Sequence, residues 1–457
     1  MVASVVPSPL TTLTSFLWHL LILQTFHLHP PSQSYLHDVE PSAWLTAVAT
    51  VSPPSMQILE ADDRQIGDDF GKCISFVDNL VLTGSPYNGP QDFGAAYFFQ
   101  RSGYYNYSST SPDLLPPPNT NAIFVPVWRP RVKLQADDPA SSDLFGFSVS
   151  LTQYQALIGA KGKNSNAGAV YLFQADFSQL NASLQWTLSH KWLASSEPSL
   201  NLSTAAEFGY AVTLGQDLFV VSAPGDSENR GTVLVFGCEV FDSGICSSWS
   251  FRARLVAQDG ASQDRFGVAV ALTPEVIVVG SPAQQNSIYI FQRQAPWSQL
   301  VKLSASTSQV GDNFGLALSA AHDNTIVVGA PNYSSYRGAA YVFQPINDTK
   351  LPWQLVATLT AASSSFNDVF GSSVAMTDQY IAIGAPGSGL NVGSGYVFSE
   401  TSPRVFSQTR FHNPNSLAAD YVGASIAIGE DRTLIVGAPA AGNLRSGQLF
   451  VFEGEYP

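Results

Sequence analysis

The chain has 457 residues, of which 45% are hydrophobic and only 12% are charged, and its formal net charge is −14 at neutral pH. Binding to nucleic acid requires clustered Lys and Arg, so this acidic composition argues against a nucleic-acid partner. The length alone would suggest about three domains. An internal repeat overrules that estimate, because repeat units bury their surfaces against one another and not alone.

Residues 1–34 are expected to form a secretory signal peptide. The run from Leu13 to Leu28 is largely apolar, has the length of a signal-peptide core and is short for a membrane span. Because the first cation is Arg64 and no small-x-small cleavage site is obvious, an uncleaved anchor or a misassigned start remain alternatives. Residues 35–52 have the composition of a loose linker. We therefore predict a secreted or cell-surface protein.

Residues 53–454 repeat one three-part phrase seven times, and we assign them to one domain. The first landmark is Phe-Gly, or Val-Gly in the last copy: Phe70-Gly71, Phe145-Gly146, Phe208-Gly209, Phe266-Gly267, Phe314-Gly315, Phe370-Gly371 and Val422-Gly423. The second is Gly-Ala-Pro or a near relative, and it follows the glycine by 13 residues in five copies and by 14 in two. The third is Tyr-x-Phe or a variant. Such constant spacing predicts two strands of fixed length joined by a tight turn.

The segments between landmarks are rich in β-branched, aromatic and small residues and end at Gly, Pro, Asn or Asp, which is typical of strands. A further strand precedes most Phe-Gly units, for example from Trp353 to Leu359. Four short antiparallel strands in each of seven units predict an all-β, seven-bladed β-propeller. The last unit is one strand short, so we expect the strand from Ser55 to Leu59 to complete it and close the ring.

The repeated Phe-Gly and Gly-Ala-Pro phrases resemble the FG-GAP repeats of the integrin α-subunit propeller, over roughly residues 55–453. The resemblance implies an extracellular propeller used in adhesion, with ligand bound by the loops of its upper face. Integrin-type blades often hold calcium in an Asp-x-Asp-x-Asp-Gly turn between their first two strands. The turns here, such as Val77-Asp78-Asn79, lack those spaced oxygen ligands, so we predict no metal site and no cofactor.

An aspartate precedes the Phe-Gly phenylalanine, or its equivalent, by two residues in six copies: Asp68, Asp143, Asp264, Asp312, Asp368 and Asp420. These residues could form an acidic ring on one face. We favour a structural role, in which each carboxylate accepts backbone hydrogen bonds in the turn entering the inner strand, because a residue repeated in every blade usually serves the blade.

The loops between the second and third strands differ from copy to copy, as a binding surface would. We take their Tyr, Asn, Arg and charged residues as candidate ligand-binding residues. They are Tyr87, Asn88, Lys161, Lys163, Asp226, Glu228, Arg230, Tyr333, Tyr336, Arg337 and Arg445. The alternative for any one of them is an ordinary solvated loop residue.

Cysteines and glycosylation sequons fit a secretory route. Cys238 and Cys246 flank a short loop, where we expect a local disulfide, whereas Cys73 is expected to be a buried free thiol. Asn-x-Ser/Thr sequons, the acceptor sites for N-glycosylation, begin at Asn106, Asn181, Asn201, Asn332 and Asn347.

No catalytic constellation is evident. The histidines of the repeat region, His190, His322 and His412, lack metal-ligand spacing, and no nucleophile elbow or phosphate-binding loop occurs. The favoured function is therefore a non-catalytic module that binds a protein or a glycan. Two alternatives stay open: a hydrolase or lyase that uses carboxylates of the upper face, and a structural subunit of a larger surface assembly.

Overall fold

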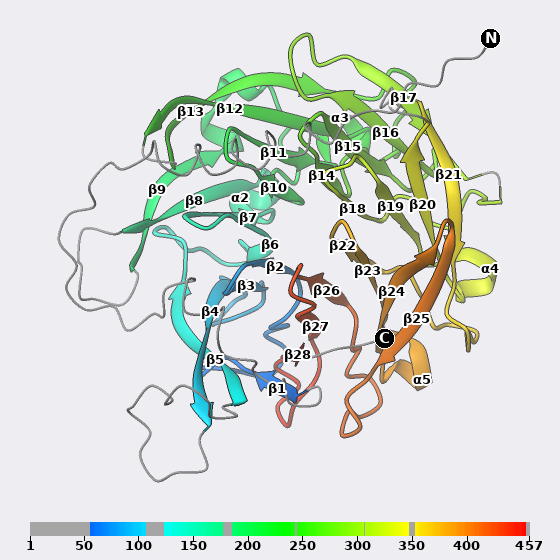
Figure 1. The fold of residues 1–457 in the computed structure, drawn as a ribbon. Coiled ribbons are helices and arrows are strands. Elements are labelled where there is room, and N and C mark those ends of the chain that lie inside the picture. The colour runs from blue at the N-terminus through cyan, green and yellow to red at the C-terminus, as the bar shows by residue number, and fades with distance from the viewer. Residues whose placement is uncertain are drawn as a thin grey trace, which may run out of the picture.

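The computed structural model of the chain is a seven-bladed β-propeller, which confirms the predicted fold (Figure 1). The structure describes residues 55–106, 123–176, 185–242, 245–305, 307–346 and 352–453. The segments predicted as signal peptide and linker lie outside these residues. Each blade is a sheet of four antiparallel strands, and the seven sheets surround a common axis with their first strands innermost.

The strands follow the repeat in chain order. Blade 1 contains β2 (Ile74–Val77), β3 (Leu80–Ser85), β4 (Ala95–Asn106) and β5 (Ile123–Leu134); blade 2 contains β6 (Phe145–Leu151), β7 (Gln155–Ala160), β8 (Ala169–Asp176) and β9 (Gln185–Leu193); blade 3 contains β10 (Val212–Leu214), β11 (Leu218–Ala223), β12 (Thr232–Asp242) and β13 (Ile245–Leu255); blade 4 contains β14 (Val270–Leu272), β15 (Val276–Ser281), β16 (Ser287–Gln292) and β17 (Gln299–Leu303). Blade 5 contains β18 (Ala317–Ala320), β19 (Ile326–Ala330), β20 (Ala339–Pro345) and β21 (Trp353–Leu359); blade 6 contains β22 (Ser373–Met376), β23 (Tyr380–Ala385), β24 (Ser394–Ser402) and β25 (Val405–Phe411); blade 7 contains β26 (Ser425–Ile428), β27 (Leu434–Ala438), β28 (Gln448–Glu453) and β1 (Ser55–Leu59).

The described helical elements are single turns. Four of them, α2 (Lys163–Asn166), α3 (Asp226–Asn229), α4 (Tyr333–Tyr336) and α5 (Ser388–Asn391), lie between the second and third strands of their blades. In each, the last three residues have positive φ. Two 3₁₀ turns, η2 (Ala194–Ser196) and η3 (Pro198–Leu200), connect blades 2 and 3.

The Phe-Gly and Tyr-x-Phe landmarks form the buried core of each blade. The phenylalanine of all six Phe-Gly units is fully buried. In blade 6, for example, Phe370 contacts Tyr396 and Phe398 edge-to-face, with ring centroids 5.4 and 6.0 Å apart. This is the favourable geometry for aromatic rings. The core clusters combine residues of neighbouring blades, so the apolar core lies between the sheets.

The glycines of the repeat allow neighbouring blades to approach closely. Gly371 has φ of +92°, a conformation that side chains other than glycine rarely adopt. A Cβ atom placed on Gly384 would lie 1.9 Å from the backbone oxygen of Gly423 in the next blade. The same approach recurs between other blades, which explains why both landmarks contain glycine.

Blade-to-blade hydrogen bonds run around the whole ring. The backbone N–H of Phe370 donates to the oxygen of Arg337 in the preceding blade, and Phe70 donates likewise to Ser446, which links blade 1 to blade 7. The N-terminal strand β1 pairs with β28 from Ser55 opposite Glu453 to Leu59 opposite Leu449. Figure 1 shows these two strands side by side. The predicted ring closure is thus confirmed.

Candidate functional site

The propeller has two distinct ends, because neighbouring strands run in opposite directions. The loops between second and third strands, and the connections from one blade to the next, lie at the same end. We call this end the variable-loop face. Its second-to-third-strand loops are residues 86–94, 161–168, 224–231, 282–286, 331–338, 386–393 and 439–447.

The repeated aspartates of this face have the predicted structural role. Each carboxylate accepts a hydrogen bond of 2.6–2.7 Å from the backbone N–H three residues earlier. Five of the six are buried, namely Asp68, Asp143, Asp264, Asp368 and Asp420, and Asp312 is half-buried. These side chains therefore stabilise the entry to each inner strand and do not form a free acidic ring.

Blade 3 lacks this aspartate and replaces it with a residue from the variable loop. Ala206 occupies the usual position, and Asp226 accepts the equivalent backbone hydrogen bond, from Ser203, at 2.8 Å. Asp226 is almost completely buried, receives a hydrogen bond from Thr232 at 2.7 Å and pairs with Arg254. Burial alone would raise the pKa of this carboxyl, but these contacts outweigh it and hold the pKa below its ordinary value.

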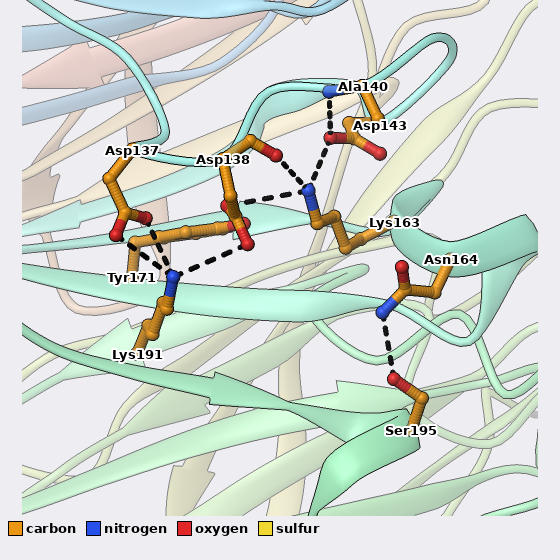
Figure 2. A network of polar contacts seen from close by, with 9 residues as sticks. All are labelled: Asp137, Asp138, Ala140, Asp143, Lys163, Asn164, Tyr171, Lys191 and Ser195. Atoms are coloured by element: carbon orange, nitrogen blue, oxygen red, sulfur yellow. Dashed lines mark hydrogen bonds and ion pairs between the residues drawn. The ribbon is translucent and has the colours of Figure 1, made fainter.

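Lys163 has a comparable buried role in blade 2. Its ammonium group lies 2.8 Å from the carboxylate of Asp143 and 3.4 Å from that of Asp138, and it donates to the backbone oxygen of Asp138. Figure 2 shows the lysine pointing from α2 toward both carboxylates. The side chain of Lys163 is only 5% exposed. In blade 1, Asn88 occupies this place and donates to Asp68 at 3.0 Å.

An outer rim of Asp–Tyr–Lys contacts surrounds these buried groups. The carboxylates of Asp63, Asp138 and Asp259 each accept a hydrogen bond from a buried tyrosine and a second one from a lysine on the outermost strand. The pairs are Tyr97 and Lys133, Tyr171 and Lys191, and Tyr289 and Lys302. Burial by itself would raise the pKa of these carboxyls, but the hydrogen bonds and lysine charges outweigh it, so each pKa lies below its ordinary value.

The predicted ligand-binding residues thus separate into three groups by exposure. Asn88, Lys163 and Asp226 are buried in the contacts described above, so we leave them out of the candidate surface. Tyr87, Lys161 and Tyr333 are half-buried. The exposed members are Glu228, Arg230, Tyr336, Arg337 and Arg445.

Lys161 belongs to a charged cluster in blades 2–4. Its ammonium lies 3.5 Å from Glu207 and 4.2 Å from the ring centre of Phe147, and Arg265 lies 2.7 Å from the same glutamate. Tyr210 contacts both cations through its ring face. Burial lowers the pKa of Lys161, although Glu207 opposes that change. Within the cluster, the two cations are therefore compensated by Glu207 and by the faces of the aromatic rings.

A group of exposed apolar side chains was missed by the sequence reasoning. The five most exposed large apolar residues of the described chain all lie on the variable-loop face, over blades 5, 6, 7 and 1. They are Ile66 (79% exposed), Val310 (71%), Phe366 (65%), Leu390 (87%) and Leu417 (71%). Ile66, Val310 and Phe366 each lie four residues before the phenylalanine of a Phe-Gly unit. In blades 2–4 the same position holds Ser141, Thr204 and Ser262, so a comparison of the repeats could have found these three apolar residues.

The opposite face carries an open cavity of about 530 Å³ between blades 3 and 4. Its walls include Arg252, Arg293, Phe241 and Trp297. Beside it, a disulfide joins Cys238 and Cys246 across the β12–β13 hairpin, with the Cα atoms 5.8 Å apart.

The predicted free thiol and glycosylation sites have the following positions. Cys73 immediately precedes β2 and is a free thiol, as predicted, but the residue is half-buried and not fully buried. Asn201 is exposed, whereas Asn332 is half-buried and its side-chain amide donates to the oxygen of Gly311 at 3.0 Å. Asn106 ends β4, and Asn181 and Asn347 lie outside the described residues.

The described residues offer little metal or acid–base chemistry. Within the described ranges, no group of three or more His, Cys, Asp or Glu could hold a metal ion. Burial raises the pKa of Asp68, Asp69 and Glu453. On the variable-loop face, Asp68 accepts a backbone hydrogen bond and Asp69 pairs with Lys72, whereas Glu453 lies at the other end of its blade and bonds to Trp128. The glutamate therefore does not share a site with the two aspartates. Among the helices that the structure describes, none is long and apolar enough to span a membrane.

Comparisons with known proteins agree with the repeat analysis. The FG-GAP repeat family model matches residues 128–173, 249–291, 297–343 and 353–398. Integrin alpha-M from Mus musculus is 29% identical over 181 residues, a match that spans 35% of this chain and only 15% of the integrin.

Two solved structures align with this chain at 12% sequence identity. The structure of U3-55K aligns with a TM-score of 0.49 over 87% of this chain and 98% of that one. Sqt1 of Chaetomium thermophilum, solved bound to the N-terminus of the ribosomal protein L10, aligns with a TM-score of 0.49 over 86% of this chain and 85% of that one. The sequence comparisons thus find FG-GAP repeats in four segments of this chain, and its propeller resembles that of integrin α-subunits.

Proposed function

We propose that this protein is a secreted or cell-surface binding module that recognises a protein or glycan partner through its variable-loop face, without catalysis. One contrast supports the proposal. Residues that recur in the blades are engaged in internal contacts, as the capping aspartates are. Residues that differ between blades, such as Tyr336, Arg337 and Arg445, stand exposed on that face.

The composition of these exposed residues also favours recognition. Tyr and Arg dominate the binding energy of protein interfaces, because they combine apolar area with directional hydrogen bonds. Tyr336 is 48% exposed and contacts Phe366 edge-to-face at 6.4 Å, so part of an aromatic surface already exists without a partner. The integrin-like repeat supports a binding role, and the extracellular location belongs to the same proposal.

The test is capture of partners from cell-surface extracts by the immobilised protein. The triple variant Tyr336→Ser, Arg337→Ser and Arg445→Ser should lose capture while its thermal unfolding stays within about 1 °C of the wild type, since exposed substitutions change stability little. Extract treated with glycosidases separates glycan from protein recognition, and a chelator arm tests the expectation that calcium is not required.

A matched control removes two exposed arginines elsewhere. Arg129 and Arg131 lie on β5, the outermost strand of blade 1, and are exposed. The variant Arg129→Ser and Arg131→Ser should bind as the wild type does. Equal capture by the triple variant and the wild type would rule out this part of the face.

A further inference from the structure

We propose that the outer rim of blade 6 binds a carboxylate from outside this chain, of the kind that an aspartate or glutamate side chain of a protein partner carries. The site consists of Ser363, Tyr396 and Arg410, and we call it the blade 6 rim site. It lies on the variable-loop face, so the inference rests on the proposed function and deepens it. Its test uses a short synthetic peptide and can fail while the proposed function stands.

Three other blades show how this part of the rim is built when it is complete. In blades 1, 2 and 4, a lysine of the outermost strand lies opposite a tyrosine of the third strand, and both donate to one aspartate. That aspartate stands seven residues before the phenylalanine of the Phe-Gly unit. The sets are Asp63, Tyr97 and Lys133; Asp138, Tyr171 and Lys191, which Figure 2 shows; and Asp259, Tyr289 and Lys302.

Blade 6 has the tyrosine and the cation of this arrangement but not the carboxylate. Arg410 lies opposite Tyr396 in the β24–β25 pair, and Ser363 occupies the position seven residues before the Phe-Gly phenylalanine. Among the described residues, the guanidinium of Arg410 donates only to the hydroxyls of Ser388, at 3.1 Å, and Ser394, at 2.8 Å. The positive charge of Arg410 therefore has no internal counter-charge.

The hydroxyl of Tyr396 is an independent sign that an acceptor is missing. Tyr396 is 1% exposed, and its hydroxyl oxygen is buried without a hydrogen-bond partner in the described part of the chain. Such unpaired buried groups are unfavourable and rare in folded proteins. The counterparts Tyr97, Tyr171 and Tyr289 all donate to their rim aspartate. A carboxylate bound to Arg410 would supply the acceptor that the hydroxyl lacks.

The fold does not require a cation at the position of Arg410. Blade 5 has Thr358 in the cation position and Thr307 in the acid position, and blade 7 has Ile58 and Asn415. Blade 3 keeps an arginine, which pairs with a carboxylate from its loop. Within the described chain, the cation and the acid are thus both present in blades 1–4 and both absent in blades 5 and 7. Blade 6 alone has the cation without the acid.

The nearby carboxylate of blade 6 does not exclude a second one. Asp368 accepts a backbone hydrogen bond of 2.6 Å in the turn that contains Ser363. Its counterparts in blades 1, 2 and 4 make the same bond beside a second carboxylate at the rim, as Asp68 does beside Asp63. Two carboxylates therefore fit in this turn when the rim cation is present. Ser363 and Arg410 are both exposed, so an external carboxylate can approach from the solvent.

An acidic amino-acid side chain matches the missing group more closely than an acidic sugar does. In the complete rims, the carboxylate is carried on one methylene group, as in aspartate, and glutamate adds only one more. Acidic sugars carry the carboxylate directly on a bulky ring. A guanidinium can also bind one carboxylate through two parallel hydrogen bonds. The chain's net charge of −14 opposes acidic ligands at long range, so only a ligand that makes these short contacts should bind.

The test uses the whole protein and an acetylated, amidated peptide of four glutamates at about 150 mM salt, where distant charges are screened. Ligand-observed NMR, which suits weak affinities, should detect binding of this peptide and none of the corresponding glutamine peptide. Arg410→Gln should weaken binding about tenfold or more, because a charge-assisted hydrogen bond is lost. The matched variant Arg404→Gln removes an exposed arginine between β24 and β25 and should bind as the wild type does.

Two pairs of variants test the missing carboxylate itself. Ser363→Asp supplies it from within the chain, so this variant should raise Tm by about 2 °C and lose peptide binding, whereas Ser363→Asn should do neither. Tyr396→Phe removes an unpaired hydroxyl and should weaken peptide binding without lowering Tm. Tyr289→Phe should lower Tm, because it loses the 2.8 Å hydrogen bond to Asp259.

The outcomes separate this inference from the proposed function. No binding of the glutamate peptide, or unchanged binding by either Arg410→Gln or Ser363→Asp, would overturn the inference. Tighter binding of N-acetylneuraminic acid than of the peptide would overturn the assignment to a protein side chain. The proposed function is judged separately, by partner capture with the triple variant of Tyr336, Arg337 and Arg445.

Discussion

Replacing Lys163 by methionine should destabilise the propeller strongly, although this residue lies in a loop of the face that we propose for binding. Its ammonium is 2.8 Å from the carboxylate of Asp143, and the side chains are only 5% and 2% exposed. Methionine would leave Asp143 buried with one hydrogen bond, from the backbone of Ala140 at 2.7 Å. Removing one partner of a buried ion pair costs about 3–5 kcal/mol.

We take the lower limit of about 3 kcal/mol, because Asp143 retains that backbone hydrogen bond. With an unfolding entropy of about 2.1 cal/mol/K per residue over roughly 400 residues, this corresponds to a fall of about 4 °C in Tm. Differential scanning calorimetry and denaturation in urea measure the two quantities. Below the transition, partner capture should equal that of the wild type, because Lys163 is not part of the exposed surface.

Two further variants isolate the cause. Lys163→Asn copies blade 1, where Asn88 donates to Asp68 at 3.0 Å, and should cost about 1 kcal/mol, the net value of a typical hydrogen bond. Adding Asp143→Asn to Lys163→Met removes the unpaired charge and should recover about half of the lost stability, as coupled neighbours do. The reasoning fails if the methionine variant unfolds like the wild type, or if asparagine is as harmful as methionine.

Three other predictions concern a thiol, a carboxyl and a pair of glycines. Burial raises the pKa of the Cys73 thiol to about 12, so Ellman's reagent should detect no thiol in the native protein and one per chain in denaturant. The pKa of Asp259 in the folded protein lies below that of a free aspartate. The ionised carboxylate therefore stabilises the fold above the pKa of a free aspartate, and this stabilisation is lost as the pH falls below about 4. The free energy of unfolding of Asp259→Asn should fall less on acidification than that of the wild type. Gly384→Ala should destabilise the fold by about 3 kcal/mol, because the new Cβ would lie 1.9 Å from the backbone oxygen of Gly423. The Cβ of Gly311→Ala would meet nothing within 4 Å, so this variant should lose only about 1 kcal/mol, because alanine disfavours the positive φ of residue 311. Chemical denaturation compares the two glycine variants, and equal costs would contradict the steric explanation.

The sequence by itself determined the architecture of this protein. The Phe-Gly and Gly-Ala-Pro landmarks are steric requirements of blade packing, so their count and spacing predicted seven blades and a ring closed by β1. The capping role of the repeated aspartates was also predictable, because the backbone N–H that each one accepts lies only three residues earlier. Local and repeated contacts of this kind leave a pattern in the sequence.

Only the tertiary structure decided which loop residues face the solvent. Lys163 and Asp226 have the residue types of a binding loop, yet their loops fold back on the aspartate turns and bury them. Leu390 and Phe366 have the residue types of a core, yet in the described part of the chain no neighbouring blade buries them. Whether a side chain is buried depends on which segment packs over it. That segment is close in space but distant in the sequence, so the residue type alone cannot predict burial.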